Sequence, residues 1–162
     1  MQNELKEKGF RGFISIQKLM EDSSCIPKKQ GVYIVLRENT KVPNFLITGT
    51  GGFFKGKNPN VTIEELKRNW VNDSPIIYIG KAGGGQTKAT LKSRLEQYLK
   101  FGQGKAVGHQ GGRYIWQLKD SRSLLICWKE LPEQDPKDIE HKMILYFKEK
   151  HGGQRPFANL QD

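Results

Sequence analysis

Cysteine is scarce in this sequence, and the two residues present, Cys25 and Cys127, lie far apart and form no CxxC pattern. A fold stapled by several disulfides is therefore excluded, because such folds need several cysteine pairs in a short chain. The two thiols could form one bridge, although free thiols in a reducing cytoplasm are the favoured interpretation. The three histidines have no ligand spacing with the cysteines, so a structural zinc site is not expected.

Long hydrophobic runs are missing as well. The apolar runs are far shorter than the roughly 20 residues that a membrane-spanning helix needs, and the start, MQNELKEKGF, has no apolar signal-peptide region. We therefore expect a cytoplasmic protein without a membrane partner. Hydrophobic residues still make up 36% of the 162 residues, which predicts one globular domain, 1–162, with a hydrophobic core.

Acidic residues are in deficit, with 17 Asp and Glu against 27 Lys and Arg, which gives a formal net charge of +10. A basic excess of this size favours a polyanionic partner, most often nucleic acid. The basic residues are spread along the chain and form no tail, which predicts a broad basic face. A soluble protein that is merely basic remains the alternative.

The order of predicted elements indicates a small mixed sheet with helices packed on it, an α/β (α+β) fold. Residues 1–30 are interpreted as a lead-in and residues 38–74 as an insertion between the first two strands. Alternation and β-branched residues predict strands at 31–37, 75–80 and 123–131, and an extended segment at 111–118. Apolar periodicity and capping residues predict helices at 16–21, 62–71, 91–101 and 136–150.

Two of the predicted strands carry a tyrosine beside a glycine, as Gly31-Val32-Tyr33 and as Tyr78-Ile79-Gly80. Side chains alternate between the two faces of a strand, so paired strands of this kind can present both phenols on one face. A phenol donates and accepts hydrogen bonds, and it can take a proton if its pKa is lowered. The alternative is that tyrosine is simply a good strand residue.

Charged side chains stand at unusual places on the predicted helices. Arg94 and Tyr98 are neighbours at i, i+4 on the edge of an apolar stripe, where a guanidinium can hold a phosphate or merely cover apolar surface. Glu140 falls inside the apolar arc of the last helix, where a carboxylate needs a metal ion or an ion-pair partner. Lys81 directly follows the second tyrosine strand and can contact phosphate or lower a tyrosine pKa.

The glycine-rich segment GGFFKGKN at 51–58 approaches the phosphate-loop pattern but ends in Asn58, so the hydroxyl that holds Mg²⁺ is missing. Pro59 also stands where a helix should begin. Exposed Phe53 and Phe54 among lysines fit a contact with nucleic acid better. The alternatives are phenylalanines folded back onto the core, and a small-nucleotide enzyme that uses this loop.

Through these residues and their order, the chain resembles the GIY-YIG nuclease superfamily over about residues 31–160. The resemblance implies a small α/β sandwich around a three-stranded antiparallel sheet, and hydrolysis of DNA phosphodiester bonds with Mg²⁺ or Mn²⁺. It places a set of polar residues in the catalytic site, in a matching order along the chain: Tyr33, Tyr78, Lys81, Arg94, Tyr98, Glu140 and Asn159.

The resemblance also implies a role for each residue. Tyr33 would activate or orient the attacking water, with Tyr78 beside it. Lys81 and Arg94 would hold the scissile phosphate, and Glu140 would bind the metal ion. The products would carry a 5′-phosphate and a 3′-hydroxyl. Tyr98 stands where family members often carry tyrosine or histidine, and Asn159 would fix the C-terminal strand or the site.

The chain departs from the family pattern between the two motifs, where 44 residues (34 to 77) replace a short connection. This insertion makes the substrate hard to infer. We expect DNA contacts from basic residues around the site: Lys55, Lys57, Lys81, Lys92 and Arg113. His109 is a further candidate. A nucleic-acid-binding domain without catalysis is the alternative function, and the sequence leaves the oligomeric state and a possible partner subunit open.

Overall fold

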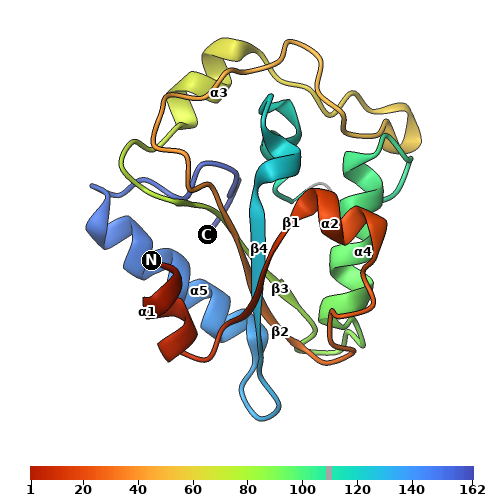
Figure 1. The fold of residues 1–162 in the computed structure, drawn as a ribbon, viewed down its shortest axis with the longest axis vertical. Coiled ribbons are helices and arrows are strands. Elements are labelled where there is room, and N and C mark those ends of the chain that lie inside the picture. Colours follow the sequence, from red (N-terminus) through yellow and green to blue (C-terminus); the bar gives the residue numbers. More distant parts are fainter. Residues whose placement is uncertain (109–110) are drawn as a thin grey trace.

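The computed structural model describes residues 1–108 and 111–162, and over these ranges the chain is a mixed α+β fold with one four-stranded antiparallel sheet and five α-helices (Figure 1). The strands are β1 (Arg11–Ser15), β2 (Gly31–Leu36), β3 (Ile76–Ala82) and β4 (Leu125–Glu130), in the spatial order β1-β4-β2-β3. The helices are α1 (Gln2–Glu7), α2 (Ile16–Glu21), α3 (Ile63–Asn69), α4 (Leu91–Gly102) and α5 (Pro136–Lys150). No helix within the described ranges is long and apolar enough to cross a membrane.

The prediction of three strands was wrong, because the segment 1–30 contributes β1, which pairs with the outer edge of β4. The sequence of β1 does not show the regular alternation of a strand. Gly12 and Phe13 take positive φ angles of 96° and 58°, and the pairing register shifts between Gly12 and Ile14. A bulge of this kind breaks the strict alternation by which strands are recognised. Gly12 is required here because the ring of Trp128 lies directly over it.

The prediction of an extended segment at 111–118 is also wrong. Residues Arg113–Gln117 form the short 3₁₀ helix η2, which begins after Gly112 in a left-handed conformation with φ of 73°. The buried Gln117 side chain of this turn bonds to the insertion. Its amide nitrogen donates to the Val61 carbonyl at 2.9 Å, and its amide oxygen accepts from the Val61 backbone N–H at 2.9 Å. The 38–74 insertion is thereby tied to η2.

Helices cover both faces of the sheet, and side-chain alternation along β2 separates two cores. Tyr33 and Val35 point toward α2 and α4, in a large core that also contains Trp116. Val32 and Ile34 point to the opposite face, where α1 and α5 pack. The two helix layers are visible on either side of the sheet in Figure 1, with α3 and the insertion beyond one end of it.

Candidate active site

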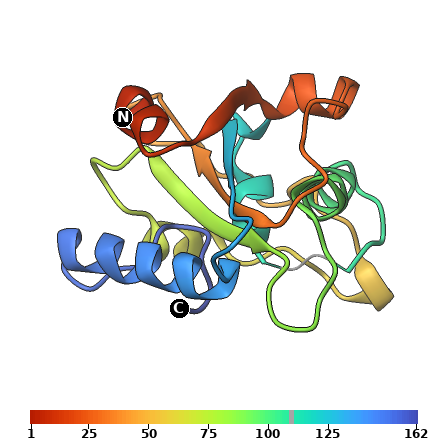
Figure 2. The ribbon, with the colours of Figure 1, turned by 90° about the horizontal axis from the view of Figure 1, so that it is seen from below.

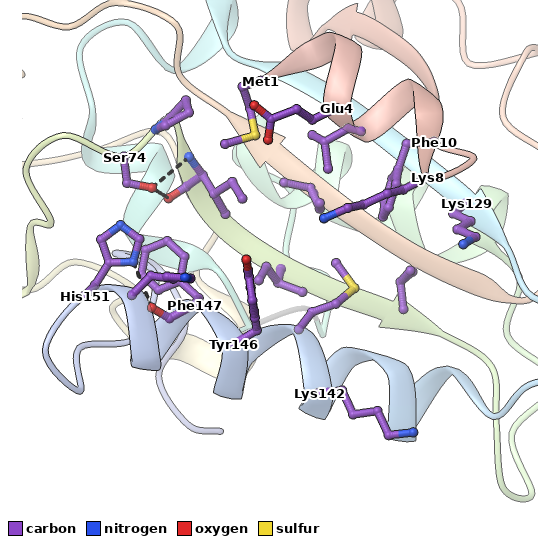
Figure 3. Close-up of a pocket in the computed structure, with 18 of the residues that line it drawn as sticks. Met1, Glu4, Lys8, Phe10, Ser74, Lys129, Lys142, Tyr146, Phe147 and His151 are labelled. Atoms are coloured by element: carbon purple, nitrogen blue, oxygen red, sulfur yellow. Dashed lines mark hydrogen bonds between the residues drawn. The ribbon is translucent and has the colours of Figure 1, made fainter.

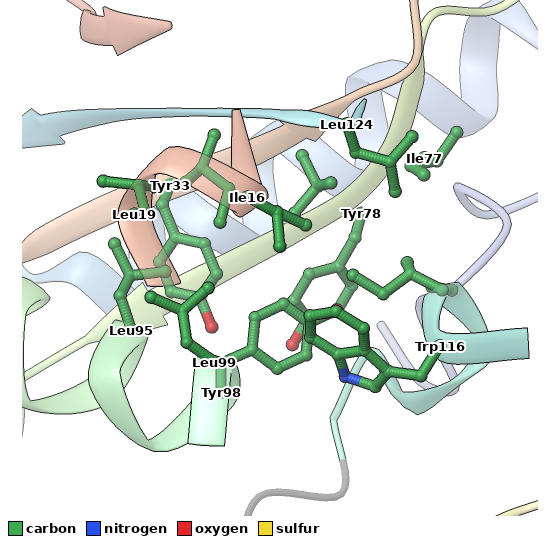
Figure 4. Close-up of a cluster of buried hydrophobic side chains, with 14 of the residues drawn as sticks. Ile16, Leu19, Tyr33, Ile77, Tyr78, Leu95, Tyr98, Leu99, Trp116 and Leu124 are labelled. Carbon is green, nitrogen blue, oxygen red and sulfur yellow. The ribbon is translucent and has the colours of Figure 1, made fainter. Parts of the chain in front are cut away.

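Three tyrosines meet on the α4 face of the sheet. The β2–β3 register pairs Tyr33 with Gly80 and Val35 with Tyr78, so the two tyrosines are diagonal neighbours on one face, as the alternation predicted. Their ring centroids are 6.0 Å apart, and Tyr98 of α4 lies 6.5 Å from Tyr33 and 5.7 Å from Tyr78. Figure 4 shows this cluster closed by Leu95 and Trp116.

Glycines make room for these rings. The Tyr33 ring lies across Gly80, and a Cβ atom added at residue 80 would come within 2.5 Å of the Tyr33 hydroxyl oxygen. On the other side, a Cβ at Gly111 would lie 2.9 Å from the Tyr78 hydroxyl oxygen, and the Tyr98 hydroxyl donates to the Gly112 carbonyl at 2.7 Å. Sequence reasoning missed Gly111 and Gly112; the only signal was a glycine pair before a run of aromatic residues.

The three phenols are neutral near physiological pH. Burial is the main cause that raises the pKa of Tyr33 and of Tyr98 well above the usual value of 10, and it raises the pKa of Tyr78 to about 12. The positive charge of Arg94 lowers the pKa of Tyr33 and of Tyr78, but burial outweighs it. Arg94 therefore acts on Tyr33 in the direction that a nearby cation should, but the net pKa of Tyr33 stays raised in the resting protein.

Glu140, Lys81 and Arg94 come together beside the tyrosines from three elements, α5, β3 and α4. The charges of Lys81 and Arg94 both lower the pKa of Glu140, while burial raises it more strongly, so the net shift is upward. The charges of Glu140 and Arg94 also act on both Tyr33 and Tyr78. These interactions link Lys81 and Arg94 to Glu140, and link Glu140 and Arg94 to Tyr33 and Tyr78.

Glu140 is a half-buried carboxylate that forms no ion pair with another described residue. Ion pairs within 4.0 Å among the described residues join other side chains, and Glu140 takes part in none of them. The alternative interpretation, that Glu140 belongs to a structural salt bridge, is therefore not supported by the described residues. Burial without a close partner is costly for a carboxylate, and it is typical of functional sites.

The donor set around Glu140 suits one Mg²⁺ or Mn²⁺ ion rather than a closed protein cage. Across the residues that the structure describes, no three His, Cys, Asp or Glu side chains group together as metal ligands. Mg²⁺ is commonly bound through one or two carboxylates, with water and substrate phosphate oxygens completing the shell. A single half-buried carboxylate on which the charges of Lys81 and Arg94 act fits that pattern.

The Asn159 side chain bonds to the backbone of β3. Its amide oxygen accepts from the Ile79 backbone N–H and its amide nitrogen donates to the Ile79 carbonyl, both at 2.9 Å. The Ala158 backbone N–H also donates to the Ile77 carbonyl at 2.8 Å. The C-terminal tail thus pairs with the outer edge of β3, on either side of Tyr78. Asn159 is therefore a positioning residue, in line with the expected role of fixing the C-terminal segment.

Replacing Asn159 by alanine should destabilise the protein by about 2 kcal/mol, since two backbone groups of β3 lose their partners, and should lower Tm by roughly 4–8 °C. Amide hydrogen exchange at Ile79 should accelerate more than exchange in β4. The matched control is Gln161→Ala, an exposed change two residues further along the tail. Unchanged protection at Ile79 would contradict the positioning role.

The other predicted basic residues are spread over several elements. Lys92 lies about 200° around α4 from Arg94, where its charge acts on Asp22. The guanidinium carbon of Arg113 lies 5.6 Å from the centroid of the Tyr114 ring. Lys55 and Lys57 are exposed at the 3₁₀ turn η1 (Phe54–Gly56), beyond the end of α4. The candidate His109 falls outside the described residues.

A cavity of about 850 Å³ lies on the opposite face of the sheet, between α1 and α5 (Figure 3). Its floor is apolar and includes Val32, Ile34 and Met143, and lysines such as Lys8 and Lys142 stand at its rim. None of the predicted catalytic residues lines it. The tyrosine site therefore does not depend on this cavity.

Comparison of the chain with protein-family models, with curated proteins and with solved structures gave no match. The resemblance to the GIY-YIG superfamily therefore rests on the motif residues themselves.

Proposed function

We propose that this protein is a metal-dependent DNA endonuclease of the GIY-YIG type. The observation that carries the proposal is the convergence of Tyr33, Tyr78, Lys81, Arg94 and Glu140, which lie on four elements and span more than a hundred positions of sequence. Bringing one half-buried carboxylate, two cations and two phenols together lowers the stability of a fold, because burying charged groups is costly. Phosphodiester hydrolysis uses this combination of groups.

In this proposal Arg94 and Lys81 bind the scissile phosphate. The planar guanidinium of Arg94 can hold two phosphate oxygens at once, and the ammonium of Lys81 adds a second positive charge. Both charges stabilise the negative charge that grows on the phosphate oxygens in the transition state. Glu140 would hold the metal ion, which when bound supplies a Lewis acid at the leaving oxygen.

The tyrosines orient the attacking water in this mechanism. Because the pKa of Tyr33 is raised, its phenol is protonated in the resting protein and acts as a hydrogen-bonding group. Tyr33 and Tyr78 are fixed by burial, by Gly80 and by the pairing of β3 with Asn159. A water held by such rigid groups keeps the in-line geometry that phosphoryl transfer requires.

A DNA-binding domain without catalysis is the second candidate function, and one observation favours it. The pKa values of all three tyrosines are raised, which opposes a general-base role. Such a domain would bind DNA with an affinity that falls steeply with salt, and it would cut no substrate with any divalent ion.

The proposal is tested by incubating the protein with plasmid, branched and single-stranded DNA in Mg²⁺, Mn²⁺ or EDTA. We expect cleavage that EDTA abolishes. Arg94→Ala should slow it by about 100-fold, as for loss of one preorganised donor, and Arg94→Lys should restore only part of the rate. Lys18→Ala, which removes an exposed positive charge on α2, serves as the matched control. Salt-dependent binding without cleavage by the wild-type protein would establish the second candidate instead.

A further inference from the structure

The 38–74 insertion presents an aromatic side chain at a basic tip, formed by Phe53, Phe54, Lys55 and Lys57. Phe53 is 50% exposed, although it is a large apolar residue. The stretch 49–60 contains no acidic residue, and neither does the neighbouring stretch 100–108, where Lys105 is exposed. The chemistry of this tip is therefore an exposed ring surrounded by positive charge.

Glycines dock the tip firmly on the domain. A Cβ atom at Gly49 would overlap the Trp116 carbonyl, and one at Gly52 would overlap the Lys105 carbonyl. The Gly52 backbone N–H also donates to the Phe101 carbonyl at the end of α4, at 2.9 Å. These glycines allow close backbone contacts, which hold the start of the tip in place against the rest of the domain.

The two phenylalanines of the tip have different surroundings. Phe54 is half-buried, and its ring lies 3.2 Å from where a Cβ atom of Gly108 would be. Lys55 takes a left-handed φ of 53°, and its ammonium lies 5.3 Å from the centroid of the Phe54 ring. A non-glycine residue in this conformation carries strain, and such strain is concentrated at functional sites. Phe54 thus anchors the tip and leaves Phe53 as its exposed ring.

The tip is close enough to the tyrosines to touch the same DNA molecule. Phe54 contacts Gly108, Tyr78 contacts Gly111, and three residues of chain span at most about 11 Å. Phe54 is therefore within about 20 Å of the Tyr78 hydroxyl, the length of about six base pairs of B-form DNA. Figure 2 shows η1 at the edge of the molecule, beyond α4.

We infer that Phe53 stacks on an unpaired base, and that the substrate of the proposed nuclease is branched or flapped DNA. In this arrangement the single-stranded part begins close to the scissile phosphate. A fixed phenylalanine has little to stack on along an intact duplex, where each base already stacks on its neighbours. Unpaired bases stack readily on aromatic side chains, and lysines beside the ring bind the flanking phosphates. The inference rests on the proposed function.

The test compares binding and cleavage of two labelled DNAs, a blunt duplex and the same duplex with a single-stranded oligothymidine flap. Binding is measured by fluorescence anisotropy in EDTA, where cleavage does not occur. Phe53→Ala should weaken binding of the flapped DNA by about 5- to 150-fold and leave binding of the blunt duplex unchanged. Phe53→Trp should retain the preference, because indole also stacks.

The matched control is Tyr146→Ala on the opposite face. Tyr146 is 57% exposed, and the ammonium groups of Lys8 and Lys150 lie 5.9 and 5.4 Å from its ring centroid. It combines an exposed ring with lysines as Phe53 does, and its loss should not change the flap preference. Equal effects of Phe53→Ala on both DNAs, or none, would overturn the inference. Because binding is read in EDTA, a failed preference is distinguishable from a failed nuclease, which would show as no cleavage in Mg²⁺.

Discussion

Glu140→Gln should abolish DNA cleavage while the protein stays folded. Glutamine keeps the shape of the side chain but removes the charge that would hold the metal ion. We expect a loss of about 1,000-fold or more, since a metal ion contributes several kcal/mol of transition-state stabilisation. The rate of cleavage in Mg²⁺ and the far-ultraviolet circular dichroism of the same preparation measure the two halves of this prediction.

The same substitution should stabilise the protein at about pH 8. Burial raises the pKa of Glu140 above its usual 4.5, so the folded state disfavours the ionised form. That cost is present when the carboxylate is ionised in both states, and it vanishes below pH 4.5, where both states are protonated. Tm of the glutamine variant should thus exceed that of the wild type at mildly alkaline pH, with a difference that shrinks toward acid.

Glu149→Gln on the same helix is the control, because Glu149 is exposed. It should change neither the cleavage rate nor the pH dependence of Tm. A substitution that removes activity and raises stability is typical of a functional site. A glutamine variant at position 140 that melts lower than the wild type at every pH would instead identify Glu140 as a structural charge.

Gly80→Ala should disrupt both the fold and the site. The new Cβ atom would lie 2.5 Å from the Tyr33 hydroxyl oxygen and 2.7 Å from its Cε2 atom, and the Tyr33 ring is fully buried and cannot swing away. Overpacking of this kind costs about 3 kcal/mol, which corresponds to a drop in Tm of roughly 6–12 °C. Cleavage should be lost even in the folded fraction, because any relaxation displaces Tyr33.

A double-mutant cycle with Tyr33→Leu isolates this clash. Leucine lacks the distal ring atoms that the new Cβ atom would meet, so Gly80→Ala should cost much less in the Tyr33→Leu background. Thermal melts of the four proteins measure the coupling. Equal costs in both backgrounds would show that Gly80 is required for the strand backbone and not for the ring.

The helices and the central strands were predictable because their signals are local. The predicted helix at 16–21 coincides with α2, and Asp135 caps α5 where the sequence places a capping residue. Thr62 likewise accepts from the Glu65 backbone N–H at the start of α3. Strand β1 was missed because its bulge at Gly12 and Phe13 is stabilised by pairing with a strand over a hundred residues away.

The site was predictable in part. Helical and strand periodicity placed Arg94, Glu140 and the two tyrosines near core-facing surfaces. The pKa shifts of the tyrosines were not predictable, because burial depends on how α4 and η2 close over the sheet. The role of Asn159 as a partner of Ile79 likewise requires the tail to return to β3, which no local pattern encodes.

The measurement that tests the central claim most directly is the Mg²⁺-dependent cleavage rate of flapped DNA by the wild type, Arg94→Ala, Glu140→Gln and the double variant. If these residues form one phosphodiesterase site, the wild type cleaves and both single variants lose most activity. The double variant should then be no slower than the slower single variant, because the groups act as a unit. No cleavage by the wild type, or rates unchanged in both single variants, would contradict the account.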